Sequence, residues 1–115
     1  MIIEKVNGKD DLKKLSVTEL NILSYEIRSA LIKKMSKLGG HMASNLGIVE
    51  ITIALHRVFD SPVDKIIFDV SHQSYVHKIL TGRKDAFLYE DKYDDVSGYS
   101  NPEESAHDFF NIGHT

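Results

Sequence analysis

Apolar residues recur every three or four positions between residues 20 and 38, which is the spacing of a helix with one buried face. Before this stretch, Ser16 precedes Glu19 by three residues, as in a capping box where hydroxyl and carboxylate each accept a backbone amide of the other residue. Gly39 and Gly40 follow the last apolar position and provide a helix stop. The pattern predicts a helix from about Thr18 to Lys37. Its apolar positions are Leu20, Leu23, Ile27, Leu31, Met35 and Leu38.

A second apolar stretch begins near Asn45 and continues to Phe59. Its apolar residues fall on nearly every side of a helix, a pattern typical of a helix that is buried all round. The many β-branched residues would also suit a strand, but the length favours a helix. Glu50 interrupts the pattern, and a buried carboxylate needs a partner or a raised pKa. We therefore expect Glu50 either at the solvated end of the helix, near its dipole, or in a functional role.

An α/β unit is expected after this helix. Asp60-Ser61-Pro62 ends the helix, because proline disfavours a helical conformation in the residue before it. The apolar run from Lys65 to Val70 predicts a short, buried, parallel strand, and residues 71–82 predict a helical segment closed by a Thr-Gly step. Ligands in such sheets lie beyond the carboxyl ends of the strands. The polar residues at that end are Asp69, Ser71 and His72.

The remaining segments carry weaker patterns. Residues 1–14 predict a brief strand at Ile2 and Ile3 followed by a polar lead-in, and the acidic residues 83–102 predict a solvated loop. Residues 103–110 predict a short helix. The closing Gly113-His114-Thr115 step resembles the entry to a helix N-terminus, where backbone amides bind an anion.

Composition narrows the class of protein. The 115 residues are 42% hydrophobic and 27% charged, with a formal charge of −3, which is ordinary for one globular domain. The sequence contains no basic stripe with interleaved aromatic residues, so a nucleic-acid partner is not indicated. Cysteine is absent, so neither disulfides nor a thiolate zinc site can form. No apolar run reaches the length of a membrane span, and no signal peptide is evident, so we expect a cytoplasmic protein without a membrane partner.

Three segments place a glycine or serine directly before a histidine: Gly40-His41, Ser71-His72 and Gly113-His114. Imidazole can donate one hydrogen bond, accept another and titrate near neutrality, so three such loops suggest a shared ligand that carries phosphate. A zinc site is the alternative, although no two histidines have the H-x₃-H spacing of zinc ligands. The other three histidines are expected on a helix surface (His56), in a structural role (His77) and in a loop (His107).

Three longer stretches surround these histidines: GGHMASNLGIVEITIALHRVF, DKIIFDVSHQSYVHKILTGRKDAF and ESAHDFFNIGHT. They resemble the N-terminal part of the 1-deoxy-D-xylulose-5-phosphate synthases, a transketolase-like family that uses thiamine diphosphate. The resemblance runs from about Leu15 to Thr115 and is weakest in the acidic stretch from Tyr89 to Tyr99. Ser71 is a departure, since the family typically has glycine there.

The resemblance implies an α/β fold. The chain would be an N-terminal fragment of a thiamine diphosphate-binding fold, mostly helical, with one or two short strands and an incomplete parallel sheet. Residues 1–115 would form part of the domain on the diphosphate side, truncated at its C-terminal end.

The resemblance also implies an activity and a set of site residues. Pyruvate and glyceraldehyde 3-phosphate would be converted to 1-deoxy-D-xylulose 5-phosphate and carbon dioxide, which supplies isoprenoid and thiamine biosynthesis. His72 would approach the cofactor's diphosphate and the reacting carbon, and His41 would line the substrate side as a second catalytic residue. The diphosphate would also contact Gly113, His114 and Thr115.

Other parts of the family pattern are absent from this sequence. It contains no Gly-Asp-Gly segment of the kind that carries magnesium ligands, and no counterpart of the glutamate that activates the cofactor. We therefore expect no catalysis by the chain alone, and no magnesium ligand is assigned. The alternatives are a non-catalytic interaction or regulatory module, one subunit of a split enzyme, or a small metal-binding protein. Self-association or a complementary chain is expected.

Overall fold

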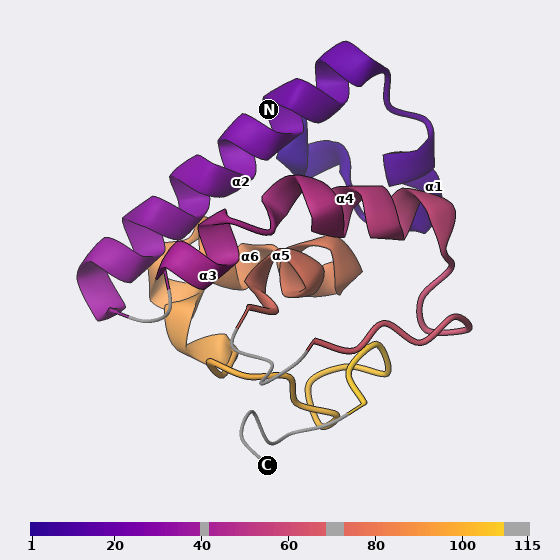
Figure 1. Ribbon diagram of the computed structural model, residues 1–115. Coiled ribbons are helices and arrows are strands. Elements are labelled where there is room, and N and C mark those ends of the chain that lie inside the picture. Colours follow the sequence, from indigo (N-terminus) through magenta and orange to yellow (C-terminus); the bar gives the residue numbers. More distant parts are fainter. Residues whose placement is uncertain (40–41, 69–72, 110–115) are drawn as a thin grey trace.

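A computed structural model describes residues 1–39, 42–68 and 73–109 (Figure 1). Within these ranges the chain forms helices and turns, and no strand occurs. None of the helices in the described ranges is both long and apolar enough to cross a membrane. The α-helices are α1 (Lys9–Lys13), α2 (Val17–Leu38), α3 (Met42–Leu46), α4 (Val49–Val58), α5 (Tyr75–Lys78) and α6 (Asp85–Leu88). Tighter or wider helical turns are η1 (Ile3–Lys5), η2 (Ile79–Arg83) and η3 (Glu90–Asp95).

The longest helix, α2, confirms the first prediction to within a residue at each end. Its capping box is present: the Glu19 amide donates to Ser16 Oγ at 3.1 Å, and the Ser16 amide donates to Glu19 Oε1 at 3.0 Å. The helix ends at Gly39, whose φ of +75° is a conformation that favours glycine.

The second predicted helix is interrupted, because residues 47–48 form a turn between α3 and α4. Helix α4 packs against α1, α2 and α5. Its buried residues lie on one face, so the prediction that it is buried all round was wrong. Val49 and Ile53 are buried, whereas Ile51 and Val58 are 59% and 73% exposed. Glu50 lies exposed in the first turn of α4.

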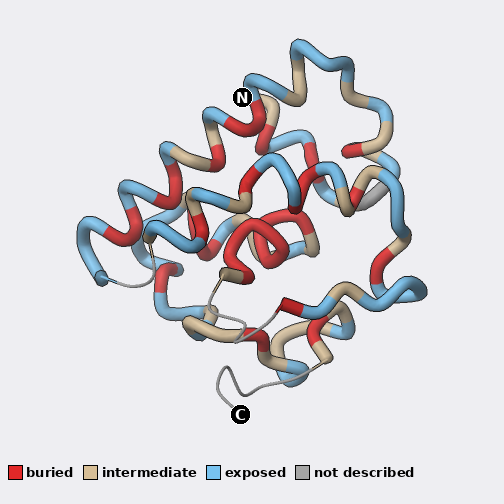
Figure 2. The backbone as a smooth tube through the Cα atoms, in the orientation of Figure 1, coloured by how far each residue is buried: buried red, intermediate tan, exposed pale blue. Residues whose placement is uncertain are grey.

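The core surrounds α5, which lies in the middle of the molecule and is buried along its length (Figure 2). Val76, Ile79 and Leu80 join the same apolar cluster as residues of α2, α4 and α6. Ile3 also enters this cluster, but from the helical turn η1 rather than from the predicted strand. The ammonium group of Lys84 holds η1 in place by donating to Glu4 O and Asn7 Oδ1, each at 2.7 Å.

The predicted strand from Lys65 to Val70 is not confirmed. Its described part, residues 65–68, is an irregular segment, in which Phe68 is buried and Ile67 is 56% exposed. A strand is stabilised by a ladder of hydrogen bonds to a neighbouring strand, and the described ranges provide no such neighbour. The incomplete parallel sheet is therefore not seen among the described residues.

Three predictions after residue 70 meet different outcomes. The described part of the predicted helical segment, residues 73–82, contains α5 and most of η2, and Gly82 closes it with a φ of +95°. The acidic stretch is not simply a solvated loop, because α6 and η3 bury Phe87 and Tyr93. The predicted helix over residues 103–110 is wrong for the described part, which forms turns.

Candidate functional site

The five predicted site residues lie outside the described residues: His41, His72, Gly113, His114 and Thr115. Asp69 and Ser71, at the end of the predicted strand, lie outside them as well. The structure describes two segments that adjoin His72 and Gly113 in the sequence. They are α5 with η2, and residues 97–109. These two segments are joined by a buried cluster of charged and imidazole groups.

The first part of the cluster centres on Lys78, whose side chain is fully buried. Its ammonium group donates to Ser97 O at 2.7 Å and forms an ion pair with Glu104 Oε1 at 3.0 Å. Burial lowers the pKa of Lys78, and the Glu104 contact opposes that shift. Burial would raise the pKa of Glu104, but the Ser97 amide and Lys78 hold it below its usual value. Lys78 and Glu104 therefore each favour the charged form of the other inside the fold.

The second part centres on the buried carboxylate of Asp108. Arg83 donates to both of its oxygens at 2.8 Å, and the amide of Asn101 donates at 2.8 Å. The Arg83 guanidinium also contacts Glu104 Oε1 at 3.1 Å, which links the two parts. Burial would raise the pKa of Asp108, but the bonds from Arg83 and His77 hold it well below its usual range.

A pair of buried histidines extends the cluster toward α4. His77 Nε2 lies 3.2 Å from Asp108 Oδ1 and 3.0 Å from His107 O. The Asp108 carboxylate and the His107 carbonyl both accept hydrogen bonds, so we assign the ring proton of His77 to Nε2. His77 Nδ1 then accepts a hydrogen bond from His56 Nε2 at 2.8 Å. Burial and the neighbouring His77 lower the pKa of His56 to about 3. The prediction that His56 lies on a helix surface was wrong, whereas the structural role predicted for His77 fits these contacts.

A cavity of about 330 Å³ lies beside the histidine pair. On its wall, Ser61 Oγ and His107 Nδ1 share a hydrogen bond of 2.7 Å. Its lining residues are Asn7, Gly8, His56, Ser61, Pro62, Leu80, Thr81, Gly82 and His107. Across the part of the chain that the structure describes, no group of three or more histidine, aspartate or glutamate side chains could hold a metal ion. The zinc alternative therefore gains no support from these residues.

The buried cluster does not fit a diphosphate group, and no group of described side chains could hold its magnesium ion. The two cations in the buried cluster, Lys78 and Arg83, are already neutralised by Glu104 and Asp108. A diphosphate would have to compete with these carboxylates, at the cost of leaving them buried and unpaired. What the cluster can do is hold two segments of the chain rigidly together, because each of its charges has a partner of opposite sign.

Sequence reasoning missed the cluster, although one signal was available. Lys78 stands in an apolar run, between Val76 and Ile79, where a buried ammonium group requires an anionic partner. Two carboxylates four residues apart, Glu104 and Asp108, were candidates for that partner. Their pairing with α5 and η2 is a tertiary contact, however, and local spacing alone does not reveal it.

Comparisons with known proteins agree over nearly the whole chain. The family model described as 1-deoxy-D-xylulose-5-phosphate synthase matches residues 3–115. The 1-deoxy-D-xylulose-5-phosphate synthase of Caldanaerobacter subterraneus subsp. tengcongensis is 55% identical over 114 residues. Those of Syntrophomonas wolfei subsp. wolfei and Thermus thermophilus are each 54% identical over 114 residues. Each match covers 99% of this chain and 18% of the relative, so the chain spans less than a fifth of the relatives' length.

Proposed function

The chain belongs to the 1-deoxy-D-xylulose-5-phosphate synthase family, and we propose that it supplies the N-terminal part of such an enzyme. The enzyme would convert pyruvate and glyceraldehyde 3-phosphate to 1-deoxy-D-xylulose 5-phosphate and carbon dioxide. The observation that carries this proposal is the 55% identity over 99% of the chain to a protein of that name. Thiamine diphosphate, when bound with magnesium, supplies the stabilisation of negative charge on carbon that such a reaction needs.

We propose that His72, Gly113, His114 and Thr115 contact the cofactor and that His41 lines the substrate side. The support comes from neighbours in the sequence. His72 precedes His77 by five residues, and Gly113 follows Asp108 by five residues. His77 and Asp108 are in contact at 3.2 Å. A buried contact between these neighbours favours a shared ligand for the two sequence segments.

In this proposal the buried cluster is the rigid support of the site. Lys78, Arg83, Glu104 and Asp108 neutralise one another, so they would position the adjoining segments without binding the ligand. Binding groups are placed most accurately when supporting residues fix the elements that carry them.

We infer that the 115-residue polypeptide is inactive by itself. Its sequence has no Gly-Asp-Gly segment, and no described group of side chains can hold a metal ion. A complementary polypeptide carrying these features would be needed, either as a continuation of the same chain or as a second subunit of a split enzyme.

A chimeric enzyme tests the proposed function. The matched region of the Caldanaerobacter subterraneus enzyme is replaced by this chain, and formation of 1-deoxy-D-xylulose 5-phosphate is measured with both substrates, thiamine diphosphate and magnesium. We expect turnover by the chimera and no carbon dioxide release by the 115-residue polypeptide above a cofactor-only control. A folded chimera without turnover, or steady release by the polypeptide alone, would contradict the proposal.

A further inference from the structure

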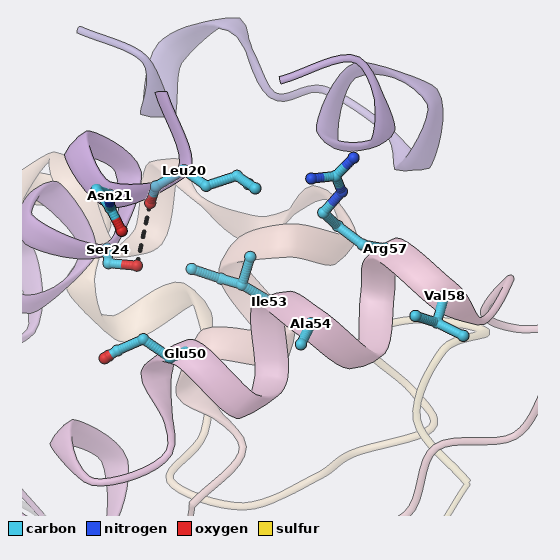
Figure 3. Close-up of a pocket in the computed structure, with 8 residues that line it drawn as sticks. All are labelled: Leu20, Asn21, Ser24, Glu50, Ile53, Ala54, Arg57 and Val58. Atoms are coloured by element: carbon cyan, nitrogen blue, oxygen red, sulfur yellow. Dashed lines mark hydrogen bonds between the residues drawn. The ribbon is translucent and has the colours of Figure 1, made fainter. Parts of the chain in front are cut away.

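An open apolar groove runs between α2 and α4 (Figure 3). Its volume is about 490 Å³. Leu20 and Ile53 contribute apolar side chains from the two helices, and Ala54 and Val58 lie along α4 on the exposed side. The complete lining is Leu20, Asn21, Ser24, Glu50, Ile53, Ala54, Arg57 and Val58.

Three polar residues of the groove, Ser24, Glu50 and Arg57, already have partners within the chain. Glu50 forms an ion pair with Arg28, and Arg57 donates to Lys13 O at 3.1 Å. The Ser24 hydroxyl donates to Leu20 O at 3.1 Å, as the dashed line in Figure 3 shows. With these groups occupied, the groove offers apolar surface to an incoming group and suits apolar side chains better than a charged ligand.

Apolar surface continues on the other side of α4. A second hollow of about 610 Å³ lies there, and it also receives residues that follow the helix. Its lining is Leu55, Phe59, Val63, Asp64, Lys65, Ile66 and Ile67. Of these, Val63 is 80% exposed and Ile67 is 56% exposed. Exposed apolar side chains around such hollows mark an interaction site more often than a free surface.

We propose that the α2–α4 groove docks an apolar helix from the part of the synthase polypeptide that this chain does not include. The inference rests on the proposed function, because the chain spans 18% of the relatives' length and the remainder is available to cover the groove. Two neighbouring helices leave a groove that accepts the side-chain ridge of a third helix. The docked helix would present apolar residues at i, i+3 or i+4, and i+7.

A thiol introduced into the groove tests this inference. Cysteine is absent from the chain, so Ala54→Cys in the chimeric enzyme gives its N-terminal region a single thiol. Its reaction with a maleimide is followed by peptide mass spectrometry, with the urea-unfolded chimera as the reference. We expect labelling in the folded chimera to be slower by roughly 100-fold or more, because reaction then requires local opening.

The matched control is Lys33→Cys, an exposed position nine residues beyond Ser24 on α2. That separation is roughly two and a half helical turns, so the control lies on the opposite side of α2 from the groove. We expect this position to react at nearly the same rate in the folded and unfolded chimera, which confines the protection to the groove.

Two outcomes would overturn the inference. One is rapid labelling at position 54 of the folded chimera. The other is protection of position 54 in the isolated polypeptide that grows with its concentration, which would mean that a second copy occupies the groove. The chimera's turnover separates the two proposals: an active chimera with a reactive thiol at position 54 contradicts the docking and leaves the proposed function standing. An inactive, folded chimera with a protected thiol contradicts the proposed function and leaves the docking standing.

Discussion

Replacing Asp108 by asparagine tests whether the buried cluster holds the fold together. The substitution keeps the shape of the side chain and removes its charge. Asp108 accepts two bonds from Arg83 at 2.8 Å and one from the Asn101 amide. After the change, Arg83 keeps only Glu104 as a charged partner in this cluster, and Glu104 must also neutralise Lys78. Two buried cations would then share one carboxylate.

The size of the effect follows from the burial of the pair. The Asp108 side chain has no exposed area, and the Arg83 side chain is 10% exposed. Removing one partner of a buried ion pair costs about 3–5 kcal/mol, a large part of the roughly 5–15 kcal/mol that stabilises a typical domain. With a urea dependence of about 1–3 kcal/mol per molar, the unfolding midpoint of Asp108→Asn should fall by roughly 2 M.

The assay is urea unfolding of the 115-residue chain at pH 7, followed by far-ultraviolet circular dichroism. The control is Asp91→Asn, which makes the same chemical change at an exposed position of η3 and should alter the free energy of unfolding by less than about 0.5 kcal/mol. If Asp108→Asn and the control behave alike, the cluster does not stabilise the fold in the way described.

Two further predictions concern single residues. Ser16→Ala removes the acceptor of the Glu19 amide in the capping box, and it should lower the free energy of unfolding by about 1 kcal/mol; an unchanged urea midpoint would contradict this. For His56, burial lowers the folded-state pKa from 6.5 to about 3. Between these two pH values the unfolded state therefore binds more protons than the folded state. Stability present above pH 6.5 should then be lost as the pH falls through that window. His56→Gln should flatten the pH dependence of unfolding between pH 6.5 and 4, and an unchanged slope would refute the assignment.

The parts of the fold that depend on local sequence could be predicted, and those that depend on tertiary contacts could not. Helix α2 begins at the Ser16–Glu19 capping box and ends at Gly39, and both signals lie within a few residues of the helix ends. His56 is buried in contact with His77, which is 21 residues away, so no helical period reveals its burial. The segment from residue 65 predicts a strand by composition, but a strand also requires a neighbour, which the described ranges lack.

The candidate site divides in the same way. The three histidine motifs and their resemblance to the synthases could be identified from the sequence alone, because the motifs are short. The buried cluster, which joins segments next to two of these motifs, could not be identified from the sequence. Its paired residues are far apart in the chain: Lys78 and Glu104 are separated by 26 residues, and Arg83 and Asp108 by 25. Only the folded chain brings these charges together.

The most direct test of the account compares His72→Ala with His77→Ala in the chimeric enzyme. We propose that His72 contacts the cofactor and takes part in proton transfer, whereas His77 supports the fold through His56 and Asp108. His72→Ala should lower kcat by about 10²–10⁴-fold, the usual contribution of a general acid or base, and weaken thiamine diphosphate binding in calorimetric titration, with the unfolding temperature unchanged. His77→Ala should lower the unfolding temperature and leave kcat of the folded fraction within about tenfold of the parent. If the two variants lose activity, cofactor affinity and stability in the same way, the assignment of different roles to His72 and His77 is wrong.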